Sequence, residues 1–300
     1  MAAVNLGVQL RRQGNADGAK AAYQLAIDSG NPDAAPVAAF NLGLLLESQG
    51  DAAGAAAAYR RAIDSGHADA APMAARDLGL LLEGQGDVAG AAAAYRRAVE
   101  SRHPEQAPMA ALNLGALLRH HGDSDGAKAA YQQAIESGTP SQTARAAVEL
   151  GLLLEDQGDM AGARAAYERA IGSGYPGAAV AEFNLGNVLR VQGDAAGAVA
   201  AYRRAIDSGD PDSAPMAARN LGLLLQAQGD AAGAAAAYRQ AIGSGHPDEA
   251  PEAAVNLGLL LEHQGDIDGA KAAFQHALDS RHPDAAPVAA YNLDKLEGRR

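Results

Sequence analysis

The chain has 300 residues, of which 24 are Lys or Arg and 36 are Asp or Glu, so its formal net charge at pH 7 is -12. This sign disfavours nucleic acid as a partner, because affinity for a phosphate backbone comes mainly from Lys and Arg. The absence of cysteine excludes disulfides, thiolate metal sites and a cysteine nucleophile. No apolar run approaches the roughly 20 residues that span a bilayer, and residues 1–15 lack the apolar segment of a signal peptide. We therefore expect a cytoplasmic protein that binds neither nucleic acid nor a membrane.

A repeat of 36 residues runs through the whole chain. One interval has 35 residues, and comparison of residues 174–180 with residues 245–251 places the missing residue in a connection between repeats. Self-similarity at a fixed period of about 20 to 50 residues is typical of solenoids and related arrays. The tripeptide Asn-Leu-Gly, or a close variant, begins at Asn5, Asn41, Asp77, Asn113, Glu149, Asn184, Asn220, Asn256 and Asn292.

The second copy shows the elements of one repeat in chain order. Apolar residues recur at helical spacing over residues 36–49, and Gly50 follows as a residue that can adopt the left-handed conformation, so a first helix (helix A) is expected to end there. Asp51 then stands where an N-cap side chain accepts backbone N–H bonds, and the second helix (helix B) ends at Gly66. In the next connection, Asp69 is the expected cap of the following helix A. No strand pattern occurs, so an all-α fold is predicted.

Neither helix can bury its apolar face alone, so each hairpin is expected to stack on its neighbours around one continuous core. The prediction is a single domain over residues 1–300, an α-solenoid of eight helix-turn-helix repeats with a capping helix at its C-terminal end. The last copy is polar enough to be this cap, because Asp294, Lys295, Glu297, Arg299 and Arg300 follow its Asn-Leu pair closely.

A glycine also recurs inside helix B, for example at Gly54. Glycine costs about 1 kcal/mol relative to alanine inside a helix, so its recurrence needs a structural reason. The expected reason is that helix A of the same hairpin crosses helix B so closely at this glycine that a Cβ atom would clash.

The repeat resembles the tetratricopeptide repeat. Leu42 and Gly43 match the family's Leu-Gly pair of helix A, Asp51 with the preceding glycine matches its inter-helix Gly-Asp, and Tyr59 matches its aromatic residue of helix B. The period departs from the family's value of about 34 residues, and Ala39 stands where the family has a large residue; the connections also resemble Sel1-like repeats. The resemblance implies a right-handed superhelix with helix A on its concave side, and a non-catalytic scaffold that binds a protein or peptide partner.

The resemblance also implies a row of ligand-binding amides. If helix A lines a groove, the residue before each Leu-Gly points towards a bound ligand, and seven of these nine residues are Asn. An amide donates and accepts at once, so such a row can hydrogen-bond the backbone of an extended peptide. The alternative is that each amide satisfies a neighbouring helix. The predicted groove amides are Asn5, Asn41, Asn113, Asn184, Asn220, Asn256 and Asn292.

The residue before each of these amides is mostly apolar and is expected to supply side-chain pockets. Two arginines in this row are candidates for pairing with a ligand carboxylate, because a guanidinium fork matches that geometry; the alternative is an intramolecular pair, for Arg76 with Asp77 or Glu83. A further row, which includes Arg11, Glu47 and Glu83, mixes both signs of charge and is expected to be a solvated rim. The candidates in the first row are Phe40, Arg76, Phe183 and Arg219.

Signals for an enzyme are absent from the sequence. Residues 172–177 match G-x-G-x-x-G as a string, but no strand precedes them. His67 and its equivalents occupy one position of successive repeats and cannot converge on one metal ion, and His120 and His121 are adjacent instead of four residues apart. We therefore expect no catalytic activity, no cofactor and no metal.

Two other functions stay open at this level. The near-identical units could stack end to end or dimerise as a self-associating architectural module. They could also form the sensor or regulatory array of a larger protein. The bias towards Ala, Gly and Arg favours a bacterial source.

Overall fold

The computed structural model describes residues 1–298. Over these residues the chain forms seventeen α-helices and one 3₁₀ turn, and no strand. The helices pair into eight hairpins, followed by a final single helix, which confirms the predicted all-α repeat architecture. Residues 299 and 300 of the predicted cap lie outside this description.

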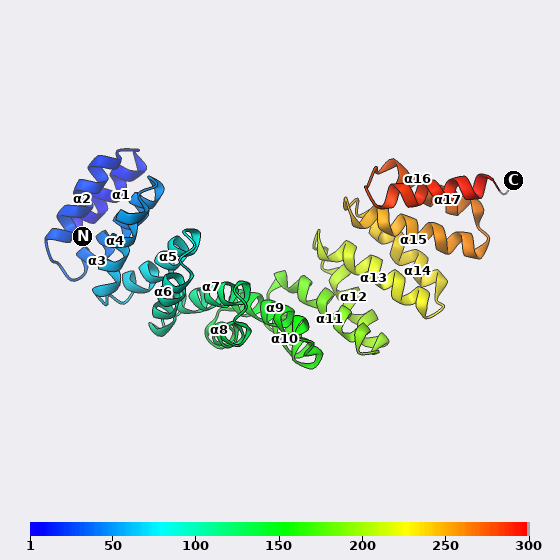
Figure 1. Cartoon of the computed structure of the whole chain (residues 1–300), viewed down its shortest axis with the longest axis horizontal. Helices are drawn as coiled ribbons and strands as arrows, with labels where there is room; N and C mark the ends of the chain where they lie inside the picture. The colour runs from blue at the N-terminus through cyan, green and yellow to red at the C-terminus, as the bar shows by residue number, and fades with distance from the viewer. Residues whose placement is uncertain (299–300) are drawn as a thin grey trace. The chain divides into compact units, whose positions relative to one another are not determined.

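The structure divides into two compact units, Met1–Leu153 and Leu154–Arg300. Figure 1 shows the hairpins following one another in chain order within each unit. The prediction of a single domain over residues 1–300 stays a prediction. The first unit contains α1 (Ala2–Arg12), α2 (Ala16–Asp28), α3 (Ala34–Ser48), α4 (Ala52–Asp64), α5 (Ala70–Gly84), α6 (Val88–Glu100), α7 (Gln106–His120), α8 (Ser124–Ser137) and most of α9 (Pro140–Asp156).

The second unit contains the remaining helices. They are α10 (Met160–Gly172), the 3₁₀ turn η1 (Pro176–Ala178), α11 (Ala179–Val191), α12 (Ala195–Asp207), α13 (Ser213–Ala227), α14 (Ala231–Gly243), α15 (Glu249–Gln264), α16 (Ile267–Asp279) and α17 (Ala285–Glu297).

Within each unit the A and B helices pack differently. A helix B such as α4 or α14 has its main contacts with the A helices before and after it. A helix A has these contacts and also touches the next helix A, as α3 touches α5 and α13 touches α15. The A helices of a unit are therefore closer together than its B helices, as on the inner side of a curved stack. We call the exposed side of the A helices in each unit its inner face.

The core of seven of these hairpins is an aromatic ring held against a glycine. The Tyr59 ring of α4 is fully buried, and a Cβ atom added to Gly43 of α3 would overlap it. The small residue lets the two helices cross at this point, so the Leu-Gly glycine sets their separation. The same contact joins Gly7 to Tyr23, Gly79 to Tyr95, Gly115 to Tyr131, Gly186 to Tyr202, Gly222 to Tyr238 and Gly258 to Phe274.

The expectation for the glycine inside helix B is wrong. A Cβ atom added to Gly54 would first meet the carboxylate of Asp51, the N-cap of the same helix, and not helix A. The reason is local, because the Gly54 backbone N–H donates to Asp51 Oδ1 at 2.9 Å and so holds the carboxylate over the glycine. In the seventh hairpin Leu225 of helix A also comes within 3.1 Å of the corresponding place at Gly233, but the nearest atoms again belong to the capping carboxylate.

The predicted end of helix A at Gly50 and the predicted cap of helix B are confirmed, and the predicted N-terminal cap of helix A is wrong. Gly50 has a positive φ of 79°, and Asp51 caps α4 as expected. Asp69 precedes α5 but makes no side-chain cap bond, because its own backbone is helical and its carboxylate cannot reach the first turn. The acceptor is His67 Nδ1, which lies 3.2 Å from the backbone nitrogens of both Asp69 and Ala70.

Candidate functional site

The predicted groove amides lie on the A helices, in one set on each unit. Asn41 and Asn292 donate to carbonyl oxygens of their own helices, Val37 at 2.9 Å and Val288 at 2.8 Å. Asn292 is also buried, so its donor is not presented to a ligand. The remaining five are half-buried or exposed.

One amide bridges two A helices of the second unit. Asn220 Nδ2 of α13 donates to Asn187 Oδ1 of α11 at 3.0 Å, and the same oxygen accepts the Tyr202 hydroxyl at 2.7 Å. This is the alternative in which an amide satisfies a neighbouring helix. The other four predicted amides make no side-chain hydrogen bond within residues 1–298. They are Asn5, Asn113, Asn184 and Asn256.

The two phenylalanines of the adjacent row are core residues. Phe40 and Phe183 are buried. Their rings lie with centroids 6.1 Å from Tyr59 and 6.3 Å from Tyr202. This position of helix A therefore faces the aromatic residue of helix B, and the phenylalanines form the floor beneath the inner face.

Arg76 and Arg219 both form intramolecular contacts that link successive A helices. Arg76 Nη2 lies 2.6 Å from Asp77 Oδ1, and its Nη1 donates to Gln106 of α7 at 2.7 Å. Arg219 Nε lies 2.5 Å from Glu249 Oε2 and its Nη1 lies 3.0 Å from Glu252 Oε2, both on α15. A ligand carboxylate would have to exchange with these partners.

The electrostatics of Asp77 show how enclosed this pair is. Burial raises the pKa of Asp77, and the hydrogen bond and charge of Arg76 oppose the rise. Burial has the largest effect on this pKa. Arg76 is the group that pairs with the buried carboxylate and offsets part of the effect.

The row of mixed charge near the end of helix A is more than a solvated rim. Glu47, Glu83 and Gln226 of this row accept the hydroxyl of the buried tyrosine twelve residues later. Tyr59 donates to Glu47 at 2.6 Å, and Tyr238 donates to Gln226 at 2.8 Å. Burial, followed by the hydrogen bond to Glu47, raises the pKa of Tyr59. In the eighth hairpin Phe274 has no hydroxyl, and Glu262 instead lies 3.1 Å from Lys295 of α17.

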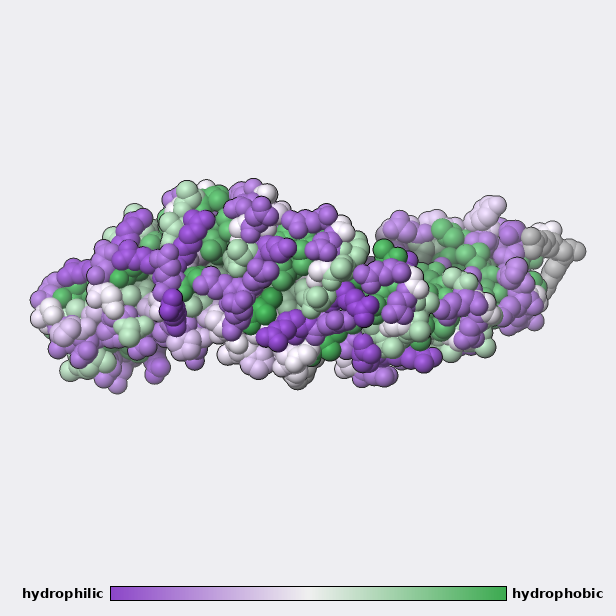
Figure 2. Space-filling view, turned by 90° about the horizontal axis from the view of Figure 1, so that it is seen from below, coloured by the Kyte–Doolittle hydropathy of each residue, from purple (hydrophilic) through white to green (hydrophobic). Residues whose placement is uncertain are grey.

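Sequence analysis missed an exposed apolar row on the inner face. Leu80, Leu223 and Leu259 follow the Leu-Gly leucine by two residues and are 46%, 42% and 41% exposed. Leu44 and Leu152 occupy the same position and are half-buried. Figure 2 shows one side of the molecule, on which apolar side chains gather in patches between polar ones. The signal was present in the sequence as a leucine three residues after five of the nine Asn-Leu-Gly starts, which are Asn41, Asp77, Glu149, Asn220 and Asn256.

Other chemistry was sought over the described part of the chain. Groups of three or more His, Asp or Glu side chains that could hold a metal ion are absent from residues 1–298. The G-x-G-x-x-G string lies in the connection around η1, which follows a helix. Over the same residues no helix combines the length and the apolar character needed to cross a bilayer.

These features define a class of protein, an all-α array of helical hairpins in which each helix B packs between A helices. The sequence profile of the tetratricopeptide repeat matches residues 4–72, 76–143, 112–179, 148–214, 183–249 and 219–290. The chain therefore belongs to the tetratricopeptide repeat family. Repeats of this family are interaction modules, which makes the chain a protein–protein interaction scaffold.

Solved structures share the fold at low sequence identity. The C-terminal part of a TPR repeat-containing protein from Cytophaga hutchinsonii has a TM-score of 0.62 at 14% identity, over 83% of this chain and 98% of that chain. PilF of Pseudomonas aeruginosa has a TM-score of 0.54 at 20% identity, over 78% and 99%. YrrB, described as a TPR protein with an unusual peptide-binding site, has a TM-score of 0.50 at 20% identity, over 67% and 98%. No curated protein matches the chain.

Proposed function

We propose that this chain is a non-catalytic scaffold that binds an extended peptide segment of a partner protein along the inner face of a unit. The observation that carries the proposal is the exposed leucine row, in which Leu259 lies three residues from Asn256, an amide that makes no hydrogen bond within the described chain. Exposed apolar patches rimmed by polar groups are typical of interaction sites. YrrB, which shares the fold, is itself described as having a peptide-binding site.

The two rows supply different parts of the binding energy. The amides of Asn184 and Asn256 can donate to and accept from a peptide backbone without reading its sequence. The side chains of Leu223 and Leu259 offer apolar surface, and burying a leucine contributes about 1.5 to 3 kcal/mol. The amides would therefore orient the peptide, and the leucines would select apolar side chains at a spacing set by the repeat.

Selection of binders from a random-peptide display library tests this proposal. Peptides that bind the whole chain would be measured again with the Leu223→Ser and Leu259→Ser double variant, and with Asn184, Asn220 and Asn256 replaced together by Ala. The matched control is Leu25→Ser, because Leu25 is exposed to 66% on α2, a helix B. We expect at least a tenfold loss of affinity in both inner-face variants and none in the control. Binding that survives both inner-face variants, in folded protein, would contradict the proposal.

Self-association is the second candidate. Leu6 and Leu25 of the first hairpin are 50% and 66% exposed, and they offer apolar surface for contact with another copy. Light scattering over a hundredfold range of concentration tests it, and a mass that stays that of a monomer would exclude it. A regulatory array within a larger protein, a cytoplasmic location and a bacterial source stay predictions.

A further inference from the structure

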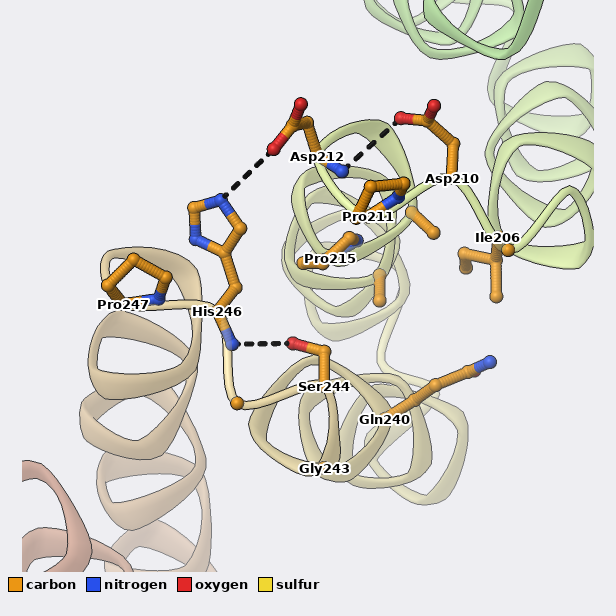
Figure 3. Close-up of a pocket in the computed structure, with 14 residues that line it drawn as sticks. Ile206, Asp210, Pro211, Asp212, Pro215, Gln240, Gly243, Ser244, His246 and Pro247 are labelled. Atoms are coloured by element: carbon orange, nitrogen blue, oxygen red, sulfur yellow. Dashed lines mark hydrogen bonds and ion pairs between the residues drawn. The ribbon is translucent and has the colours of Figure 1, made fainter. Parts of the chain in front are cut away.

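A cavity of about 840 Å³ opens in the second unit, away from the inner face. It lies between the connection that precedes α13 and the connection that follows α14 (Figure 3). Ile206, Pro215 and Ala218 are buried apolar residues in its lining, and Gln240 and His246 contribute polar groups. The corresponding cavity of the first unit, beside Ile63 and Arg97, has only about 290 Å³.

Arginine side chains occupy the equivalent place in other hairpins. Arg97, two residues after the buried tyrosine of α6, lines the small cavity and lies 3.4 Å from Asp64 Oδ1 of the preceding hairpin. Arg204 holds the same position on α12 and lies 2.8 Å from Glu182 Oε1. Arginine stands at this position of helix B four times, as Arg61, Arg97, Arg169 and Arg204, and in Arg97 and Arg204 it lies beside a carboxylate.

The seventh hairpin lacks both the arginine of helix B and the glutamate of helix A that form the pair in the sixth hairpin. Gln240 stands at the position of Arg97 and Arg204, and Ala218 stands at the position of Glu182. Gly243 replaces the acidic residue that ends other B helices, such as Glu100 of α6. The larger cavity is thus lined by a short neutral side chain where the smaller one is lined by a long cationic side chain.

The carboxylates around this place remain. Asp207 is the counterpart of Asp64, and an ion pair of Asp207 with a basic side chain is not found in the part of the chain that the structure describes. Asp212 Oδ1 lies 4.0 Å from His246 Nε2 at the mouth of the cavity. The third carboxylate is that of Asp210, whose pKa is lowered because the backbone N–H of Ser213 donates to it. It is therefore ionised at neutral pH.

His246 lies at the mouth of the cavity. Its Nδ1 accepts the backbone N–H groups of Asp248 and Glu249, each at 3.2 Å. Its Nε2 faces Asp212 (Figure 3). The lining of the cavity thus combines apolar residues with the carboxylates of Asp210 and Asp212.

We propose that this cavity binds an arginine side chain of a partner protein. The apolar stem would lie against Ile206 and Pro215, and the guanidinium group would pair with Asp207 and Asp212, replacing the internal arginine of the sister hairpins. A guanidinium suits this place because it forms directed, charge-assisted hydrogen bonds to carboxylates while its stem packs on apolar surface. The site is independent of the inner face.

Methyl NMR of the full chain tests the proposal with N-acetyl-L-arginine methylamide as the probe. We expect a saturable shift of the Ile206 methyl signal, and at least tenfold weaker binding of the citrulline analogue, which has the same shape without the charge. In Gln240→Arg the internal guanidinium refills the cavity, so the shift should disappear while the melting temperature is kept. No saturable shift in the parent chain, equal binding of citrulline, or an unchanged response in Gln240→Arg would overturn the proposal.

The first unit offers the reverse experiment. Arg97→Gln should open the small cavity and free Asp64, so the probe should shift the Ile63 methyl signal in this variant and not in the parent chain. A folded Arg97→Gln protein without this second shift would overturn the equivalence on which the assignment depends.

Discussion

The crossing of helices A and B and the N-terminus of helix B each carry a recurring glycine, for two different reasons. At the crossing, Gly43 faces the fully buried ring of Tyr59, which has no room to move. At the N-terminus of α4, Gly54 faces the carboxylate of Asp51, a short side chain at an exposed helix end. Recurrence shows that a position is constrained, but the neighbouring atoms decide how strongly.

The largest effect is expected at the crossing. Gly43→Ala would drive a methyl group into the Tyr59 ring, and such overpacking costs roughly 1 to 3 kcal/mol, although alanine favours the helix. Urea denaturation followed by circular dichroism measures the loss of unfolding free energy. An unchanged midpoint would show that Gly43 and the Tyr59 ring are less closely packed than in the structure.

Removal of the cap should have the next largest effect. Asp51→Ala leaves the Gly54 backbone N–H without its acceptor, and loss of an N-cap typically costs about 1 kcal/mol. The same denaturation series measures it, with Asp51→Asn as the control because an asparagine at this place, Asn15, caps α2. If Asp51→Asn were as unstable as Asp51→Ala, the cap hydrogen bond would not be the source of the effect.

Replacement of the helix B glycine should change stability less. In Gly54→Ala the gain in helix propensity, about 1 kcal/mol, is offset by displacement of the Asp51 carboxylate, so the net change should be smaller than that. In the background of Asp51→Ala nothing remains to be displaced, and the same substitution should stabilise the protein by the full propensity difference. Equal effects of Gly54→Ala in both backgrounds would refute the contact between the two residues.

The smallest effect is expected at the N-terminus of a helix A. Asp210→Asn keeps the cap, because Asn31 accepts the equivalent backbone N–H groups before α3, but it removes the charge. Since the pKa of Asp210 is lowered in the folded protein, its charge stabilises above the unfolded pKa, about 3.9, and this contribution is lost as the pH falls through the folded pKa. The variant should therefore be slightly less stable than the parent at pH 7, by less than about 1 kcal/mol, and equal to it near pH 2. A difference that persists in acid would point to a change in the loop itself.

Much of the architecture was predictable from sequence because its signals are local. The helical spacing of apolar residues, the glycine at position 50 with its positive φ, and the cap by Asp51 each depend on residues within a turn or two of one another. The cap of helix A was mispredicted even though its contacts are local too. A histidine two residues before the N-cap is not a usual capping residue, and only the helical backbone of Asp69 shows why its carboxylate cannot serve.

The candidate site was less predictable, because it depends on which side chains meet across repeats. The sequence shows that Arg219 lies among apolar residues on helix A, but not that Glu249 and Glu252 of the next helix A reach it. It shows leucines one and three residues after Asp77, but not that Leu80 stays exposed while Leu78 is buried. Periodicity assigns a residue to a helix face, and the packing of the neighbouring hairpin decides what that face touches.

The sequence by itself determined the helices, their pairing into hairpins and the family, because a repeated pattern of short-range signals specifies one hairpin and copies it along the chain. The tertiary structure decided which glycine meets the tyrosine ring, which arginines are already paired, and where a cavity opens beside Gln240. Those outcomes depend on distances of a few ångströms between residues far apart in the chain, such as Gly43 and Tyr59 or, 30 positions apart, Arg219 and Glu249. Such distances follow from how side chains fill the space between hairpins, and the spacing of residues along the chain does not contain them.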